Sequence, residues 1–165
     1  GRVSLDNTRF SPAGMGIVAF VDIPGDGGYK ALCTDNPEVA EYVLRDLTKG
    51  YTHPPYGQDL PLVEAVFTQS GDMRVDPSWR IETADHAVLA TWTAILPVVI
   101  ANGRWPDGEA PFHVFSLLHF AEGAAIALDG RAIEGEPYLR DIWRPSIGGD
   151  RSSCVFALAE TITTV

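Results

Sequence analysis

The sequence predicts a mainly β protein, an antiparallel meander closed or curled into a barrel, with one α-helix at about residues 37–49 packed against it. Three observations favour this class. Short runs rich in Val, Ile, Phe and Thr recur along the chain, separated by Gly, Pro and Asp. One segment alone combines a helix cap with helical spacing. After Gly50 no strand alternates with a helix, as it would in a parallel α/β fold.

Length and composition predict one domain over residues 1–165. A chain of 165 residues is long enough to bury a hydrophobic core without disulfide or metal staples. Hydrophobic residues make up 45% and charged residues 21%, values that are ordinary for a globular protein. No compositional boundary divides the chain.

The N-terminal part of the chain predicts an arm or short edge strand followed by two paired strands. The first dozen residues carry little periodicity. Gly16–Ile23 is rich in β-branched and aromatic residues, and the turn sequence Pro-Gly-Asp-Gly-Gly closes it. Tyr29–Thr34 is then the expected return strand.

The helix is predicted from its cap and its spacing. Asn36 offers an N-cap, and Pro37 occupies a position that the first helical turn tolerates. Apolar residues recur every four positions at Val39, Val43 and Leu47, until Gly50 provides a stop. We expect this helix to cover one face or one mouth of the sheet.

The rest of the chain predicts strands and turns. Asp129-Gly130, between two apolar runs, predicts a type I′ hairpin, and Glu122-Gly123 predicts a second one just before it. Consecutive hairpins favour a meander, which in general architecture resembles a calycin barrel. The expected strands are Leu62–Gln69, Trp79–Ile95 (bent or bulged), Val98–Ala101, Phe112–Ala121, Ala124–Leu128, Arg131–Glu134 and Ser153–Thr163.

The charge and the cysteines of the chain indicate which kinds of binding partner and which cellular setting to expect. With 12 basic and 22 acidic residues the net charge is -10, so the field of the protein repels nucleic acid and anionic lipid. No apolar run approaches the length of a membrane span. Cys33 and Cys154 lack metal or redox spacing and are expected as free thiols in a reducing, cytoplasmic setting, with the question of a signal peptide before Gly1 left open. Neither a cofactor nor a metal is expected.

The candidate site residues come mainly from the predicted strand Trp79–Ile95. In one regular strand, alternate residues share a face, so a cation, an acid, a base and an indole would line one side among small residues: Arg80, Glu82, His86 and Trp92. Either this face lines a ligand cavity or it is a solvated surface. Glu82 and His86 would lie roughly 13 Å apart, too far to touch directly.

Further candidates lie elsewhere in the chain. His113 and His119 would be about 20 Å apart along one strand, so they cannot ligate the same metal ion. The Pro-rich loop Tyr51–Pro61 carries Tyr56, either as the wall of a binding site or as part of a packed connector. Another aromatic and cationic stretch, read either as a barrel-closing crossover or as a carboxylate site, contains Tyr138, Arg140, Trp143 and Arg144.

Three functions remain open from the sequence. The first is binding of a small apolar or weakly polar molecule in the barrel, with Tyr56, Arg80, Glu82, His86, Trp92 and His119 as contacts. The second is a cofactor-independent isomerase, cyclase or lyase, with His86 and Glu82 as the best catalytic candidates. The third is a non-catalytic interaction domain or homodimer that uses an exposed strand edge. We rank binding first, because no complete catalytic set is visible.

Overall fold

The computed structural model describes residues 1–50, 54–104 and 112–164. The protein is mainly β, with 54% of residues in strands and 11% in helices. Contacts group the chain into two compact units. The first unit comprises residues 1–70, 78–90 and 125–135, and the second comprises residues 71–77, 91–124 and 136–165. Whether the two units form the single domain predicted from the sequence depends on how they join, so the single domain stays a prediction.

A four-stranded sheet, sheet A, forms the centre of the first unit in the order β1-β2-β3-β4. β2 pairs antiparallel with β1 and with β3, whereas β4 lies parallel to β3. The parallel pairing departs from the predicted meander. The chain returns to β3 through a helix and a long loop, which is the kind of crossover that parallel pairing requires. Its elements are β1 (Arg2–Thr8), β2 (Gly16–Ile23), β3 (Tyr29–Thr34), α1 (Pro37–Tyr42), η1 (Val43–Leu47) and β4 (Leu62–Glu64).

The helix begins where the sequence predicts. The Asn36 side chain accepts hydrogen bonds from the backbone amides of Glu38 and Val39, and Pro37 opens the first turn. The α-helix ends at Tyr42 and continues as the π-helical turn η1, which ends at Leu47 before Gly50 adopts a left-handed conformation. The helical segment therefore has the predicted start and a slightly shorter end.

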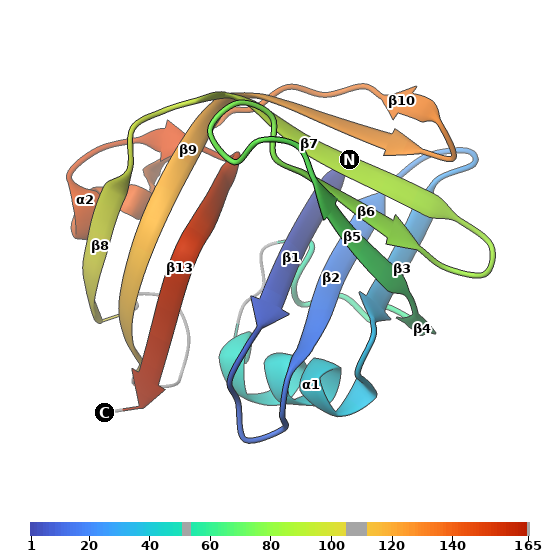
Figure 1. The fold of residues 1–165 in the computed structure, drawn as a ribbon, viewed down its shortest axis with the longest axis horizontal. Helices are drawn as coiled ribbons and strands as arrows, with labels where there is room; N and C mark the ends of the chain where they lie inside the picture. Colours follow the sequence, from blue (N-terminus) through green and yellow to red (C-terminus); the bar gives the residue numbers. More distant parts are fainter. Residues whose placement is uncertain (51–53, 105–111, 165) are drawn as a thin grey trace. The chain divides into compact units, whose positions relative to one another are not determined.

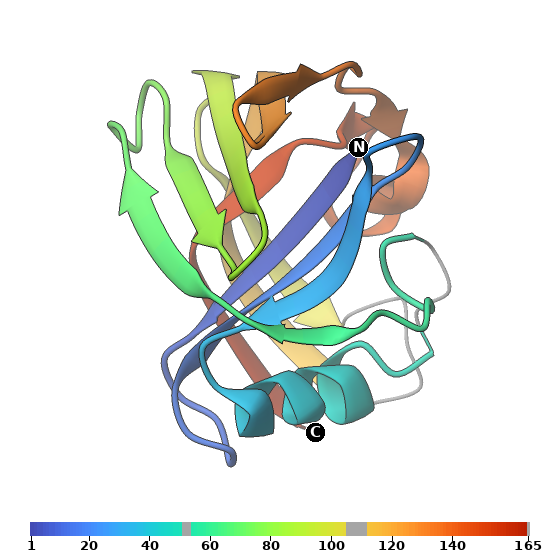
Figure 2. The same cartoon turned by 90° about the vertical axis from the view of Figure 1, so that its right-hand side faces the viewer.

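Sheet A is buried on both faces, which explains its nearly continuous apolar strands. On one face, Phe20 and Leu32 pack with Val39 and Val43 of the helical segment. In Figure 2 the helix lies across the lower end of the sheet. On the opposite face, residues of β2 and β3 pack against strands of a second sheet: Ala19, Val21, Ile23, Ala31 and Cys33 against Ala65, Ile81, Val88 and Leu128.

The second sheet, sheet B, is a curled half-barrel, so the predicted curled architecture is confirmed. Its strand order is β10-β9-β7-β6-β5, and β8 and β13 also pair with β9. β7 and β9 contribute residues to both units. The strands are β5 (Val66–Ser70), β6 (Ser78–Glu82), β7 (Ala87–Ile95), β8 (Val99–Arg104), β9 (Phe112–Leu128), β10 (Arg131–Ile133) and β13 (Val155–Thr164).

The second unit contains a small helical cap beside its strands. Phe120 of β9 meets Trp143 edge to face, with ring centroids 5.3 Å apart. Leu118 and Ala101 complete this buried cluster. Arg144 pairs with the carboxylate of Asp150 within the same segment. The cap is built from β11 (Leu139–Arg140), η2 (Asp141–Trp143), α2 (Arg144–Ile147) and β12 (Arg151–Ser152).

The structure differs from the predicted strands in three places. Leu62–Gln69 is two strands in different sheets, joined at the buried Ala65, whose amide bonds to the carbonyl of Thr34 at 2.8 Å. The hairpin at Glu122-Gly123 is wrong, because β9 runs straight through these residues. Gly123 is needed there for close packing, since a Cβ atom would lie 2.3 Å from Oγ1 of Thr93. The hairpin at Asp129-Gly130 is confirmed, with both residues at positive φ.

The third difference changes the candidate face. Trp79–Ile95 is not one strand, because a tight turn reverses the chain between β6 and β7. The amide of Thr83 donates to the carbonyl of His86 at 2.9 Å, and the Thr83 hydroxyl accepts from the amide of His86. Alternation therefore does not run from Arg80 to Trp92. Arg80 and Glu82 share a face of β6, but the prediction that His86 and Trp92 continue this face is wrong.

A buried carboxylate anchors the loop after the helix to sheet A. The strand register places Asp22 between Arg2 and Lys30 on the neighbouring strands, and Lys30 Nζ lies 2.9 Å from its carboxylate. Nε2 of Gln58, from the loop, donates to Asp22 at 3.1 Å. Burial alone would raise the pKa of Asp22, but the hydrogen bonds from Lys30 and Gln58 and the charges of Lys30 and Arg2 together lower it.

Replacing Asp22 by Asn should destabilise the first unit in a pH-dependent way. Because the folded-state pKa lies below the ordinary value, the charged carboxylate stabilises the fold above about pH 4 and loses that effect as the pH falls further. We expect Asp22→Asn to lower the free energy of unfolding by about 1 kcal/mol at pH 7 and by less at pH 3, measured by urea denaturation. The exposed Asp26→Asn is the control, and an equal loss at both pH values would contradict the role of the charge.

Candidate functional site

A cleft in the first unit is a candidate site. It has a volume of about 350 Å³ and opens between the end of sheet A and the β5-β6 ribbon. We call it the Trp79 cleft. Its lining comprises Asn7, Thr8, Arg9, Met15, Gly16, Ile17, Asp35, Phe67, Gln69 and Trp79.

The aromatic wall of the cleft comes from β5 and β6. Gln69 lies directly opposite Trp79 in the ribbon, and Phe67 lies opposite Ile81. Because directly opposed residues share a face, these four side chains all point to the same side of the ribbon. Ile81 is buried in the core, whereas Phe67 and Trp79 are only partly buried. The cleft therefore begins where the apolar core ends.

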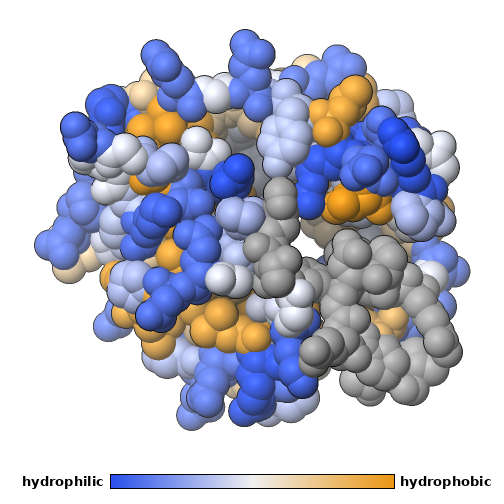
Figure 3. Space-filling view, turned by 180° about the vertical axis from the view of Figure 1, so that it is seen from behind, coloured by the Kyte–Doolittle hydropathy of each residue, from blue (hydrophilic) through white to orange (hydrophobic). Residues whose placement is uncertain are grey.

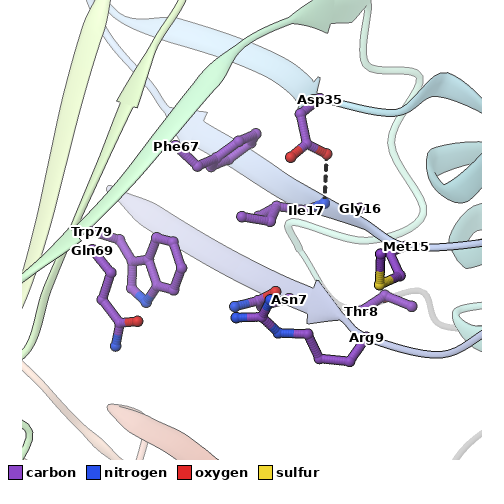
Figure 4. A pocket seen from close by; sticks show the side chains of 10 residues that line it. All are labelled: Asn7, Thr8, Arg9, Met15, Gly16, Ile17, Asp35, Phe67, Gln69 and Trp79. Atoms are coloured by element: carbon purple, nitrogen blue, oxygen red, sulfur yellow. Dashed lines mark hydrogen bonds between the residues drawn. The ribbon is translucent and has the colours of Figure 1, made fainter.

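The other wall comes from sheet A and follows the same logic. Asn7 lies opposite Ile17 in the β1-β2 pair and continues the face on which Leu5 and Ala19 pack into the core. Along the inward-facing side of β1, the apolar Leu5 is thus followed by the amide side chain of Asn7. Figure 4 shows this amide across the cleft from Trp79 and Gln69.

Asp35 is held at the rim by the backbone. Its Oδ1 atom accepts a hydrogen bond from the amide of Ile17 at 2.7 Å. Gly16 permits this approach, because a Cβ atom there would lie 2.8 Å from Cβ of Asn36 and 3.1 Å from Oδ1 of Asp35. A larger residue at Gly16 would push the rim of the cleft away.

None of the six predicted ligand-binding residues lines the Trp79 cleft. Arg80 forms an ion pair of 2.9 Å with Glu82 on the exposed side of β6. Tyr56 packs against Phe20 with ring centroids 4.9 Å apart, and its hydroxyl bonds to Ser4 at 2.5 Å. Tyr56 therefore belongs to the packed layer around the helical segment, as its alternative interpretation as a connector predicts.

The two remaining aromatic candidates lie in the second unit. His119 stacks on Phe156 with ring centroids 5.3 Å apart, and its Nδ1 atom bonds to the carbonyl of Leu96 at 2.9 Å. Trp92 meets the same Phe156 edge to face. His113 bonds separately to Asn102. Within this unit the structure brings Trp92 and His119 together around one phenylalanine.

His86 has a partner that the sequence analysis did not name. Its Nδ1 atom lies 2.8 Å from Oδ2 of Asp129, while Oδ1 of Asp129 accepts from the amide of Ala87 at 2.7 Å. These bonds, from Ala87 and then from His86, lower the pKa of Asp129. The pair joins the β6-β7 turn to the β9-β10 hairpin. A catalytic role for His86 and Glu82 stays a prediction.

The phenol that packs against His86 is neutral at physiological pH. The Tyr29 ring packs against His86 with centroids 4.5 Å apart. Burial is the main cause that raises the pKa of Tyr29 to about 12, and burial also raises the pKa of its neighbour Cys33. Both described cysteines are free thiols, as predicted. A neutral phenol and a buried thiol supply no ready nucleophile beside the histidine.

The described part of the chain contains no cluster of three or more metal-ligating side chains, and none of its helices is long and apolar enough to cross a membrane. Comparison with protein-family models, with curated proteins and with solved structures finds no match for this chain.

Proposed function

We propose that this protein binds a small, weakly polar molecule that carries a flat ring, in the Trp79 cleft. The observation that carries the proposal is the composition of the cleft: two half-buried aromatic side chains face polar groups across about 350 Å³ of open space. Binding sites for small molecules typically combine an apolar wall with a few polar groups that fix orientation.

The aromatic wall favours a ring as the main contact. Phe67 and Trp79 present apolar surface that the core does not cover, and a flat ring would bury it by stacking. The amides of Asn7 and Gln69 lie on opposite walls, at the ends of the apolar rows. They would then bond to polar atoms at the edge of the ring.

Electrostatics favours a small neutral or zwitterionic ligand over nucleic acid. The chain has a net charge of -10, which repels a phosphate backbone at long range. A compact ligand without net charge escapes this repulsion.

The alternative functions have less support. His86 and Asp129 do not line the cleft, so an enzyme that used them would need a different substrate site. On the face drawn in Figure 3, apolar side chains form separate patches among hydrophilic ones. Among the described residues on that face, these patches do not join into the continuous apolar area that marks many protein interfaces.

Replacing Trp79 should weaken binding of a ring compound. We expect indole, titrated into the protein by calorimetry, to bind about tenfold more weakly to Trp79→Ala, because half of the aromatic wall is lost. Trp92→Ala is a matched control, since Trp92 is also half-buried but lies in the second unit. Loss of binding in Trp92→Ala, with Trp79→Ala unaffected, would move the site to the residues predicted from the sequence and overturn the cleft proposal.

A further inference from the structure

The Trp79 cleft contains two opposite charges that do not pair with each other. Arg9 forms no ion pair or side-chain hydrogen bond with any residue that the structure describes. Elsewhere in this chain, Arg80 and Arg144 each hold a carboxylate. In Figure 4 the Arg9 side chain extends into the cleft toward Trp79. Arg9 is exposed to solvent, so its guanidinium is available to a ligand that enters the cleft.

Asp35 is the second charge. One oxygen accepts the hydrogen bond from Ile17, which fixes the carboxylate at the rim. The other oxygen makes no hydrogen bond or ion pair with the described residues, and the carboxylate faces the space in front of Phe67 in Figure 4. The cleft thus has an anchored acceptor on one side and an exposed donor on the other.

Only a ligand with both charges satisfies both side chains. A purely anionic ligand would pair with Arg9 but would meet Asp35 and the repulsion of a chain with net charge -10. A purely cationic ligand would pair with Asp35 and leave Arg9 unpaired beside another positive charge. A zwitterion has no net charge and supplies one partner to each.

We propose, resting on the function proposed above, that the ligand is an aromatic amino acid or a close analogue of one. Its ring would stack on Trp79 and Phe67, its carboxylate would accept the paired donors of the Arg9 guanidinium, and its ammonium group would donate to the free oxygen of Asp35. The planar guanidinium fork matches a carboxylate in geometry, and an ammonium group bonds well to a carboxylate oxygen.

Four indole compounds separate the contributions of the ring and of the two charges. Indole carries the ring alone, indole-3-acetate adds a carboxylate, tryptamine adds an amine, and tryptophan carries both. We expect calorimetry at pH 7 and low salt to show tryptophan binding about tenfold tighter than indole. Indole-3-acetate and tryptamine should lie between them, because each pairs with one side chain but meets a like charge at the other. Equal affinities for all four compounds would overturn this inference while leaving the ring-binding function in place.

Two variants assign the charges to their side chains. Arg9→Gln should make tryptophan bind no tighter than tryptamine, and Asp35→Asn should make it bind no tighter than indole-3-acetate. Asn at position 35 keeps an oxygen for the amide of Ile17, so the rim is preserved. The controls Arg74→Gln and Asp26→Asn alter exposed residues outside the cleft and should leave the order of affinities unchanged.

The outcomes distinguish the two proposals. If none of the four compounds binds, or if Trp79→Ala binds all of them as the unaltered protein does, the ring-binding function itself fails. If indole binds through Trp79 but tryptophan keeps its advantage in both charge variants, the function stands and the assignment to Arg9 and Asp35 is wrong.

Discussion

Replacing Phe20 by Ala should remove about 3–5 kcal/mol from the free energy of unfolding. Phe20 is 2% exposed and lies on the face of β2 that meets the helical segment. Its ring also packs against Tyr56, which bonds to Ser4 on the neighbouring strand. Truncation would leave a cavity lined by three elements, and such a cavity collapses only in part.

The chain offers a matched control for this substitution. Phe10 is 97% exposed, so Phe10→Ala removes the same atoms without opening a cavity and should change stability by less than about 0.5 kcal/mol. Urea denaturation of both variants, followed by far-ultraviolet circular dichroism, measures the difference. Equal losses in the two variants would show that Phe20 is not part of a packed layer.

Replacing Gly28 by Ala should cost about 2–3 kcal/mol, since the added methyl group meets backbone rather than a movable side chain. A Cβ atom at Gly28 would lie 2.2 Å from the carbonyl oxygen of Ile23 and 2.8 Å from that of Gly25. Gly28 also donates its amide to Gly25 at 3.0 Å, which closes the loop between β2 and β3. To admit the methyl group, the loop between β2 and β3 must open, which also separates the ends of these two strands.

Gly103→Ala is the matched control for this prediction. A Cβ atom at Gly103 would have no neighbour within 4 Å among the residues that the structure describes, and this glycine lies within the strand β8. We expect its thermal midpoint to stay within experimental error of the unaltered protein, while that of Gly28→Ala falls by several degrees. A Gly28→Ala variant as stable as Gly103→Ala would mean that the loop rearranges without loss.

Local signals in the sequence predicted the elements whose structure is decided locally. Gly16–Ile23 and Tyr29–Thr34 are strands with the predicted bounds, because a run of apolar residues between glycine-rich turns has few other stable arrangements. Asn36 and Asp129-Gly130 act through bonds and backbone angles that involve only their neighbours.

Errors arose where the decisive contact comes from elsewhere in the chain, or where a turn lacks glycine. Gly123 looked like a turn residue, but its role is to admit Thr93 of a neighbouring strand. The turn at Thr83–His86 depends on a threonine hydroxyl, a weaker signal than glycine or proline. Missing that turn placed Arg80, Glu82, His86 and Trp92 on one strand face.

The Trp79 cleft was missed for a related reason. Its walls come from segments about sixty residues apart, which meet only through packing of the two sheets. The sequence did contain a partial signal of the cleft. On the inward-facing sides of β1 and β5, the apolar residues are followed near the strand ends by the polar residues Asn7 and Gln69. His86 was singled out as a candidate residue, but its partner Asp129, 43 positions away in the sequence, was not.

The way the chain alternates between the two units has a consequence for its synthesis. It passes from one unit to the other five times, after Ser70, Pro77, Ala90, Ala124 and Gly135. The first unit therefore lacks its last strands until residues 125–135 have been synthesised. Until then, the edge of β7 that pairs with β9 has unpaired backbone groups. No single cut of the backbone releases either unit intact.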